Sequence, residues 1–442
     1  AGSEGARLAA EYIAAACQAL GLEPVGRAYY QPVPLVEATI RSGTLVVTSE
    51  TERSVFESPR DFVADLGGGP SLAGFGGPTV FLEAPLRPVT DVRNAVAIAE
   101  AIRDRAALDS LAVRGAAGLV LTVTDPRQYD LFARSRGETR LVLDGGEAPS
   151  SLLRALPTVA AGPAASAAIL RGRRVGESSD GPLGGRVDVS LDVVRTSAPD
   201  NNVACLRPGT DPRARDTAIV LTAHFDHLGI GLPDAHADSV YNGFSDNAAG
   251  VAMLLGIASA VRRPDRAPRH SMLFLFCTAE EQGLLGSDYY TAHPVWPLER
   301  TLAVINLDAG APPGPPSSWR LAGIPGSQLA TLATDVALAH GWSATVSQAT
   351  PNSDHYPFLR AGVPAVFVIP GPGPYEGMSV DSSRALKARW DAYHQPGDGW
   401  FPEFPLAGLA RYADYALLIA NALDRGLTEP GDRVFQRGRG RP

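Results

Sequence analysis

The sequence predicts an α/β fold: a mixed, mostly parallel sheet sandwiched between helices, with a smaller α/β domain inserted. From about residue 186 onward, apolar segments of strand length alternate with helical patterns. Continuous apolar strands between helices are typical of a parallel sheet that is covered on both faces. A second observation is that all eight histidines lie at or after position 224. The first half of the chain is therefore a poor candidate for histidine-based metal chemistry.

Residues 1–59 are predicted to form the N-terminal part of the main, catalytic domain. Residues 4–21 place apolar side chains at helical spacing and end at a glycine, which predicts an amphipathic helix packed on a sheet. The segments QPVPLVEATI and TLVVTS are predicted to be strands of the same domain.

Residues 60–185 are predicted to be the inserted domain. Strand-like segments alternate there with two Ala-rich helical patterns, NAVAIAEAIRDRAALDSLAV and AASAAILRG, and neither His nor Cys occurs. The Gly- and charge-rich segment at residues 171–185 is typical of a linker that leads out of this domain.

Residues 186–425 are predicted to be the main part of the catalytic domain. RVDVSLDVV and NNVACLRPG indicate a hairpin, which strands and helices then follow in alternation. The predicted strands are AIVLTAH, HSMLFLFCTAEE, TLAVINLDAG and VPAVFVIPG, and the predicted helices include AAGVAMLLGIASAVR, GSQLATLATDVALAHG and FPLAGLARYADYALLIANALDRG. The basic tail, residues 426–442, is predicted to be flexible.

Composition and charge argue against several classes of protein. A hydrophobic content of 45% with 19% charged residues is that of a globular chain. The net charge of −8 argues against nucleic acid as a partner, because nucleic-acid binders usually carry a basic surface. No apolar run reaches the roughly 18 residues of a membrane span. The three scattered cysteines, Cys17, Cys205 and Cys277, predict no disulfide framework, and Cys277 is expected to be a buried apolar residue.

Polar residues gather where the predicted strands end or a helix begins. Six of them lie at these positions: His224, Asp226, Asp246, Glu280, Glu281 and Asp308. The carboxyl ends of parallel strands meet at one edge of a sheet, where ligands bind. We therefore expect these side chains to converge, rather than to be unrelated turn formers and caps.

Their chemistry fits a divalent metal ion. Imidazole and carboxylate groups are ligands of zinc, and a catalytic site leaves one position open for water. Two imidazoles and three carboxylates exceed what one zinc needs, and they suit two ions about 3.5–4 Å apart with one bridging carboxylate. A spare glutamate would then serve as general base.

Six segments, in the same order, resemble the two-zinc aminopeptidases of the aminopeptidase S and aminopeptidase Y type. They are AHFDHLG, YNGFSDNAAGVAMLLGIA, FCTAEEQGLLGSDYY, VINLDAG, SDHYPFLRAGVPAVFV and AYHQPGD. That family also contains glutamate carboxypeptidase, glutaminyl cyclase and the catalytically inactive transferrin receptor. The resemblance covers the N-terminal helix and residues 186–425. Residues 60–185 resemble, more weakly, the protease-associated domain, through VRGAAGLVLTV and LPTVAAGPAASAAIL.

The resemblance implies two Zn²⁺ ions and five ligands: His224, Asp246, Glu281, Asp308 and His394. Asp246 would bridge the two ions. His224 and Asp308 would bind one ion, and Glu281 and His394 would bind the other. In the alternative pairing, Glu281 would bind the same ion as His224, and Asp308 the same ion as His394.

The resemblance also implies three catalytic residues. Glu280 would be the general base. Asp226 would hold the second ring nitrogen of His224 and fix its tautomer. Tyr393 would donate a hydrogen bond to the tetrahedral oxyanion.

The remaining histidines are expected to lie outside the ligand set. His355 is the strongest competitor of His394, but the family pattern places the ligand at the later Tyr-His pair, so His355 is expected to line the pocket or to orient a loop. His227 is expected to face a neighbouring loop. The other four are expected at the surface: His236, His270, His293 and His340.

The implied reaction is hydrolysis of the N-terminal peptide bond of peptides with a free N-terminus. Alternatives are a carboxypeptidase or other amide hydrolase on the same zinc core, and a single-zinc enzyme like glutaminyl cyclase. A non-catalytic binding protein would require broken ligands, whereas all five ligands and the base are present. The family implies a secreted or periplasmic location, and we interpret the N-terminus, which lacks a signal-like start, as already processed.

Overall fold

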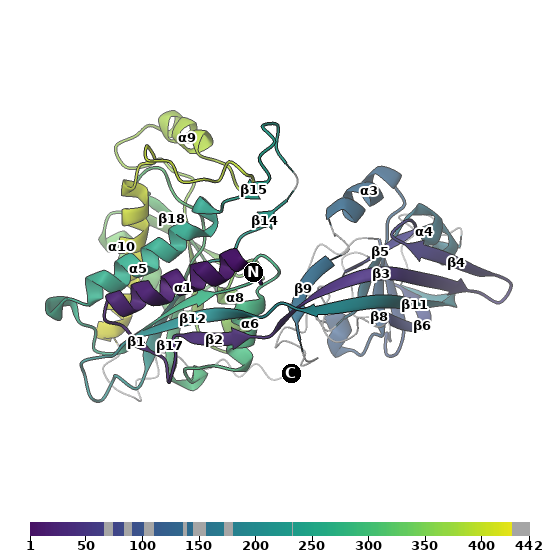
Figure 1. Cartoon of the computed structure of the whole chain (residues 1–442), viewed down its shortest axis with the longest axis horizontal. Helices are drawn as coiled ribbons and strands as arrows, with labels where there is room; N and C mark the ends of the chain where they lie inside the picture. Colours follow the sequence, from purple (N-terminus) through teal and green to yellow (C-terminus); the bar gives the residue numbers. More distant parts are fainter. Residues whose placement is uncertain are drawn as a thin grey trace. The chain divides into compact units, whose positions relative to one another are not determined.

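The computed structural model describes residues 1–65, 74–83, 91–100, 110–135, 139–144, 156–171, 180–231 and 233–426. The chain forms two compact units, of which the first combines Ala1–Val33 with Asp200–Pro442 and the second is Pro34–Pro199. Each unit contains its own nine-stranded sheet (Figure 1). The tail predicted to be flexible lies outside the described residues, apart from Gly426.

The sheet of the first unit is mixed, as predicted. Its strands are β1 (Glu23–Pro24), β2 (Tyr30–Val33), β12 (Asp200–Arg207), β13 (Ala218–His224), β16 (Ser271–Cys277), β17 (Thr301–Leu307), β18 (Ser318–Gly323), β19 (Ser343–Gln348) and β20 (Ala365–Pro370). They lie in the order β1-β12-β16-β13-β17-β20-β18-β19, and β2 also pairs with β12. The four central strands β16, β13, β17 and β20 are parallel, so their carboxyl ends lie at one edge.

Helices cover both faces of this sheet. Because successive side chains of a strand point to opposite faces, Phe274 and Phe276 join one core and Leu273 and Leu275 the other. Side chains of α1 (Glu4–Ala19), α5 (Ala249–Val261), α7 (Gln328–Ala339) and α10 (Ala407–Gly426) complete the first core. Side chains of α6 (Leu285–Ala292) and α8 (His355–Arg360) complete the second. Two further elements lie in connections: α9 (Val380–Arg389), and the ribbon of β14 (Gly229–Ile230) and β15 (Val240–Tyr241).

One helical segment, Phe244–Val261, is long and apolar enough to cross a membrane by length and composition alone. Of this segment, 56% is buried inside the protein. Leu254 and Ile257 of α5 belong to the first core of the sheet. A helix that is apolar all round is also what the middle of a large core requires, and we interpret α5 in that way.

The second unit is built around two long antiparallel strands, β3 (Leu35–Thr48) and β11 (Gly181–Ser197). The other strands are β4 (Arg53–Ser58), β5 (Phe62–Asp65), β6 (Gly74–Phe81), β7 (Val96–Ala99), β8 (Gly118–Thr122), β9 (Thr139–Leu143) and β10 (Thr158–Ala161). Their order is β4-β3-β11-β6-β7-β8-β10-β5, with β9 also paired to β3. The described helices of this unit include α3 (Pro126–Ser135) and α4 (Pro163–Leu170).

The limits of this unit, residues 34–199, are wider than the 60–185 predicted for the inserted domain. The predicted strands within residues 31–49 mostly form β3, which pairs with β11 rather than with the main sheet. The predicted hairpin of RVDVSLDVV and NNVACLRPG is likewise wrong, because the former lies in β11 and the latter forms most of β12, in different units. Alternation along one strand does not reveal its partner, so the sequence misplaced these boundaries.

The helix predicted at residues 94–113 is wrong in its first part. Val96–Ala99 form β7, whose four residues are all buried between the parallel strands β6 and β8. Tertiary pairing thus overrides the helical preference of an Ala-rich segment. Residues 101–109 lie outside the described part of the chain.

The cysteine prediction is half right. A disulfide joins Cys17 of α1 to Cys205 of β12, although no disulfide was expected. The two residues are 188 positions apart and meet only because α1 packs on the edge of the sheet, so their spacing carried no signal. Cys277 is free and buried, as predicted.

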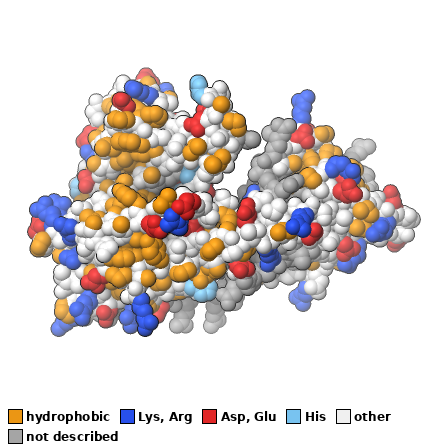
Figure 2. All heavy atoms as spheres, in the orientation of Figure 1, with side chains coloured by type: hydrophobic (Ala, Val, Ile, Leu, Met, Phe, Trp, Pro, Cys, Tyr) orange, Lys and Arg blue, Asp and Glu red, His pale blue; other side chains and the backbone are white. Residues whose placement is uncertain are grey.

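Figure 2 shows acidic and basic side chains interspersed with apolar ones over the visible face. Several charged side chains of the protein form exposed pairs within one element, such as Arg7 with Glu4 in α1 and Arg186 with Asp188 in β11. Water screens exposed pairs of this kind, so they do little to hold the fold together.

Candidate metal centre and active site

The polar residues singled out in the sequence meet at the carboxyl edge of the central strands. His224 is the last residue of β13, Glu281 follows β16 and Asp308 follows β17. Asp246 lies in the irregular turn Phe244–Ala248 before α5. His394 reaches the same place from the connection between α9 and α10.

His224, Asp246 and Asp308 form one cluster. The Nε2 atom of His224 lies 2.7 Å from Oδ1 of Asp308 and 3.1 Å from Oδ1 of Asp246. Ligands 2.0–2.2 Å from a tetrahedral zinc ion are about 3.4 Å from one another. The three donor atoms therefore have nearly the spacing of a metal site.

Asp246, Glu281 and His394 form a second cluster. The Nε2 atom of His394 lies 3.0 Å from Oδ2 of Asp246 and 3.3 Å from Oε2 of Glu281. That nitrogen is buried and makes no hydrogen bond among the described residues. The two oxygens of Asp246 thus face one cluster each, and His224 is grouped with Asp308 rather than with Glu281.

His227 faces the neighbouring loops that carry Glu281 and His394, as expected, and it belongs there to the second cluster. Its Nδ1 atom lies 2.8 Å from Oε1 of Glu281, and its ring meets that of His394 edge to face at 5.6 Å. With Asp246 and Glu281 it forms a further set of three potential ligand groups. The available signal was its position three residues after His224, in the loop that leaves the same strand end.

Asp226 has a different contact from the one implied by the resemblance. The Nδ1 atom of His224 donates to the backbone oxygen of Asp226 at 3.0 Å, while the Asp226 carboxylate is 3.7 Å away. That carboxylate instead accepts the backbone N–H groups of Glu280 at 3.0 Å and Glu281 at 3.4 Å. The backbone therefore fixes the His224 tautomer, and the carboxylate holds the turn that carries both glutamates.

Glu280 stands in an environment that favours its protonated form. Burial raises the pKa of Glu280 well above its ordinary range, the charge of His224 opposes this, and the carboxylates of Asp308 and Asp354 add to the increase. A carboxyl group with a raised pKa accepts and releases a proton closer to neutral pH.

The pKa values of His224 and Asp246 are shifted in opposite directions. Burial by itself lowers the pKa of His224, but the charges of Asp308 and Glu280 outweigh it, so this pKa is raised well above its ordinary value. Burial raises the pKa of Asp246, yet the hydrogen bond and charge of His224 lower it overall. The site therefore concentrates negative charge, which favours a cation.

Side chains around the clusters hold these residues in place. The second oxygen of Asp308 accepts a hydrogen bond from the hydroxyl of Ser353. Asp398 accepts the backbone N–H groups of Ser245 at 2.9 Å and Asp246 at 3.1 Å. Asp398 comes from the same connection as His394, so this connection supports both clusters.

Tyr393 lies beside the second cluster and is 66% exposed. Its ring stacks on that of His394 with centroids 3.9 Å apart. Partial desolvation and the charges of Asp246 and Glu281 raise the pKa of Tyr393 to about 12. The hydroxyl therefore remains a hydrogen-bond donor at neutral pH.

The competing histidines lie elsewhere. His355 is buried at the start of α8, where its ring packs against Phe367, and burial lowers its pKa to about 3. His270, expected at the surface, is buried, and its Nδ1 atom lies 3.0 Å from Oδ1 of Asp424. His236, His293 and His340 are exposed, as predicted.

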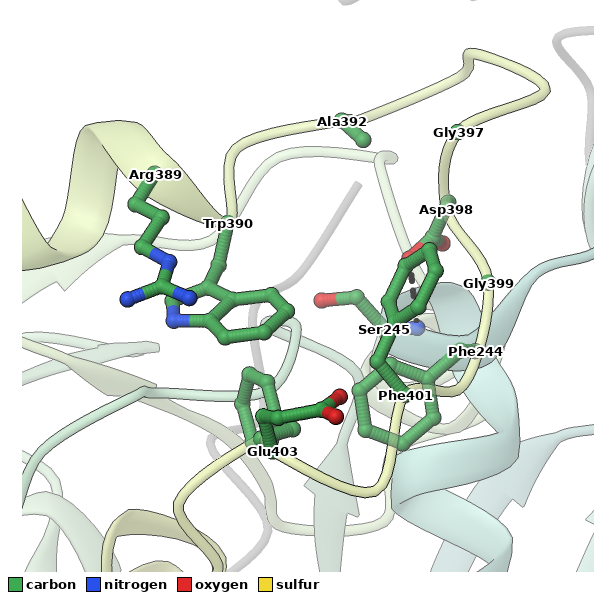
Figure 3. Close-up of a pocket in the computed structure, with 11 residues that line it drawn as sticks. Phe244, Ser245, Arg389, Trp390, Ala392, Gly397, Asp398, Gly399, Phe401 and Glu403 are labelled. Carbon is green, nitrogen blue, oxygen red and sulfur yellow. Dashed lines mark hydrogen bonds between the residues drawn. The ribbon is translucent and has the colours of Figure 1, made fainter.

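A cavity of about 410 Å³ is lined by residues of the Phe244–Ala248 turn and of the connection that carries His394 (Figure 3). Four aromatic side chains line it: Phe244, Trp390, Phe401 and Phe404. The carboxylate of Glu403 points between Trp390 and Phe401 (Figure 3). Ser245 and Ala392, which precede the cluster residues by one and two positions, also line the cavity.

The fold and the two clusters are those of a metallopeptidase. Residues 201–419 match peptidase family M28, and the chain belongs to this family. The resemblance drawn from the sequence motifs is thereby confirmed at the level of the family.

Two curated relatives match part of the chain. A probable leucine aminopeptidase 2 of Aspergillus oryzae is 28% identical over 231 residues, which are 48% of this chain and 42% of that protein. A vacuolar membrane protease of Yarrowia lipolytica is 36% identical over 83 residues, 18% of this chain and 8% of that protein. The matched segments thus span less than half the length of these relatives.

A solved structure matches over nearly the whole chain. The aminopeptidase from Aneurinibacillus sp. strain AM-1 aligns with a TM-score of 0.51 at 18% identity, covering 96% of this chain and 89% of that one. This likeness concerns the fold, and it confirms the predicted α/β class. The protease-associated character of the second unit stays a prediction.

Proposed function

We propose that this protein is a metallo-aminopeptidase with two zinc ions, which hydrolyses the N-terminal peptide bond of peptides. The observation that carries the proposal is the shared carboxylate of Asp246, whose two oxygens face two separate ligand clusters. Family M28 membership and the similarity to a probable leucine aminopeptidase support it.

His224 and Asp308 would hold the first ion, Glu281 and His394 the second, and Asp246 both. Nitrogen and carboxylate donors at these separations fit zinc. Bound zinc would supply Lewis acidity and would lower the pKa of a coordinated water. His394 is apt for this role because its buried Nε2 atom has no protein hydrogen-bond partner among the described residues.

Glu280 would move the proton. It directly precedes the proposed ligand Glu281 in the chain, and its carboxyl group would take a proton from water and return it to the leaving amine. Asp226 would position Glu280 by accepting its backbone N–H. The Tyr393 hydroxyl, protonated at neutral pH, would donate a hydrogen bond to the developing oxyanion.

The aromatic cavity would receive the side chain of the first substrate residue. It shares two chain segments with the clusters, through Ser245 next to Asp246 and Ala392 near His394. Four aromatic rings favour a large apolar side chain there, because burial stabilises by about 25 cal/mol per Å² of apolar surface. The concentrated carboxylates beside it would attract the free α-amine.

The test uses aminoacyl-p-nitroanilides with free and N-acetylated amines, before chelation, after chelation and after return of zinc. We expect zinc-restored cleavage of the free-amine substrates only, fastest for large apolar residues. Loss of all cleavage in a protein that holds two zinc ions would contradict the aminopeptidase assignment and favour carboxypeptidase chemistry. A protein that binds a single zinc would favour a cyclase-like site.

We also propose an extracytoplasmic location. The disulfide between Cys17 and Cys205 supports it, because such bonds persist in oxidising compartments and are rare in the cytosol. Fractionation of the producing cell should find the protein outside the cytoplasm with both thiols blocked to alkylation. Free thiols at both positions in the freshly isolated protein would contradict this location.

A further inference from the structure

The two oxygens of Glu281 have different partners. Oε2 faces the second cluster, 3.3 Å from Nε2 of His394. Oε1 lies 2.8 Å from Nδ1 of His227. A carboxylate can bind a metal through one oxygen or through both. A hydrogen-bond donor at Oε1 therefore decides whether Glu281 binds through Oε2 alone or through both oxygens.

His227 is held firmly in this position. Its side chain is 6% exposed and that of Glu281 7%, so the hydrogen bond between them is shielded from water. The chain passes so close on the other side that a Cβ atom at Gly243 would lie 2.7 Å from Cβ of His227. The edge-to-face contact with the ring of His394 restricts the His227 side chain from a third direction.

We propose that His227 is a positioning residue of the second metal position, an inference that rests on the function proposed above. Its Nδ1–H group donates to Oε1 of Glu281, so that Glu281 presents only Oε2 to the ion. Hydrogen bonds of this kind orient ligating groups, and their loss typically costs about 10–100-fold in metal affinity. The described hydrogen bonds and ring contacts of His227 reach Glu281 and His394 but not His224 or Asp308, so the first position should keep its affinity.

The experiment compares His227→Ala with His227→Asn. The side-chain amide of asparagine places an N–H donor near the position of Nδ1, whereas alanine removes it. Zinc affinity is measured by competition with a chelating indicator, and coordination of the second ion by the absorption spectrum of the cobalt-substituted protein. We expect the alanine variant to bind the second ion about 10–100-fold more weakly, with a changed cobalt spectrum, and the asparagine variant to retain most of the affinity.

The matched control is His236→Ala, which removes an exposed histidine from the connection between β14 and β15. Its two zinc affinities should equal those of the wild type. Melting curves of the metal-free variants separate misfolding from a local loss of affinity, and the asparagine variant remains informative if alanine unfolds the loop.

Two outcomes would overturn the proposal. Unchanged second-ion affinity in His227→Ala would leave the residue without a role in metal binding. Equal loss in the alanine and asparagine variants would make His227 a direct ligand, because an amide cannot replace an imidazole at zinc. A wild-type protein with no second zinc would instead refute the proposed function itself.

Discussion

The two clusters that share Asp246 are built in different ways. His224 and Asp308 stand at the ends of adjacent parallel strands, and their side chains are 1% and 8% exposed. His394 comes from a connection between helices and is 34% exposed. The first cluster is therefore fixed by the sheet, whereas the second depends on a loop and on the hydrogen bonds that hold it.

This difference predicts an order of affinity. Ligands on strands keep their geometry in the absence of metal, so little ordering is needed when the ion binds. A loop ligand must be ordered on binding, which costs part of the binding free energy. If the proposed zinc sites are correct, the second ion should leave first during stepwise chelation.

The largest expected effect is on kcat. It comes from a substitution that should impair the catalytic step and leave metal binding at both clusters intact. Glu280→Gln should lower kcat by roughly 10²–10⁴-fold, because the amide cannot accept the proton. The variant keeps the backbone N–H that Asp226 accepts, so its zinc content should equal that of the wild type. Steady-state kinetics with parallel metal analysis measures both. Near-wild-type kcat would remove Glu280 from its proposed role.

The proposed difference between the two clusters can be tested directly by removing one imidazole from each. His224→Ala leaves the buried carboxylates of Asp246 and Asp308 without their shared partner, so it should abolish binding at the first position and destabilise the fold. His394→Ala should lose only the second ion. Metal analysis after dialysis, with melting temperatures, distinguishes the two. Equal zinc content and equal melting temperature in both variants would mean that the clusters are not distinct.

The convergence of the residues that follow the strands was accessible from sequence because their signals are local. A buried apolar segment that ends in a polar residue marks the edge of a parallel sheet, and His224, Glu281 and Asp308 each follow this pattern. His394 came from a family motif rather than from any periodicity. The layers of the first unit were predictable for the same reason, since strand and helix patterns alternate along the chain.

What the sequence could not show depends on contacts between distant segments. The pairing of β3 with β11 set the true limits of the second unit. The approach of α1 to β12 created the disulfide. The contact of His227 with Glu281 joins residues 54 positions apart, and neither segment contains a sequence signal that predicts contact with the other.

A smaller effect concerns the cavity, which borders the second cluster through Ala392. Trp390→Ala would remove one aromatic wall, and even one methylene group in an apolar pocket changes selectivity by about 1–3 kcal/mol. We expect kcat/KM for leucyl and phenylalanyl p-nitroanilides to fall at least about 10-fold, with little change for the alanyl substrate. An equal fall for all three would place the first side chain elsewhere.

The smallest expected effect concerns His270 and Asp424, a histidine–carboxylate pair that contacts neither cluster and therefore serves as a reference for both. Burial would raise the pKa of Asp424, but hydrogen bonds from the His270 ring and from the backbone N–H groups of Arg269 and His270 lower it overall. The folded pKa therefore lies below the unfolded value of about 3.9. The ionised carboxylate stabilises the fold above this value, and its contribution is lost as pH falls through the folded pKa.

Asp424→Ala leaves one buried and one partly buried backbone N–H group without acceptors, which should cost about 1–3 kcal/mol of stability at neutral pH. The difference in melting temperature from the wild type should shrink as the pH falls below about 4. Zinc content should not change, because the pair resembles the ligand clusters only in residue type. A loss of zinc in this variant would show that metal affinity follows global stability, and the contrast between a sheet-built and a loop-built position would then need another explanation.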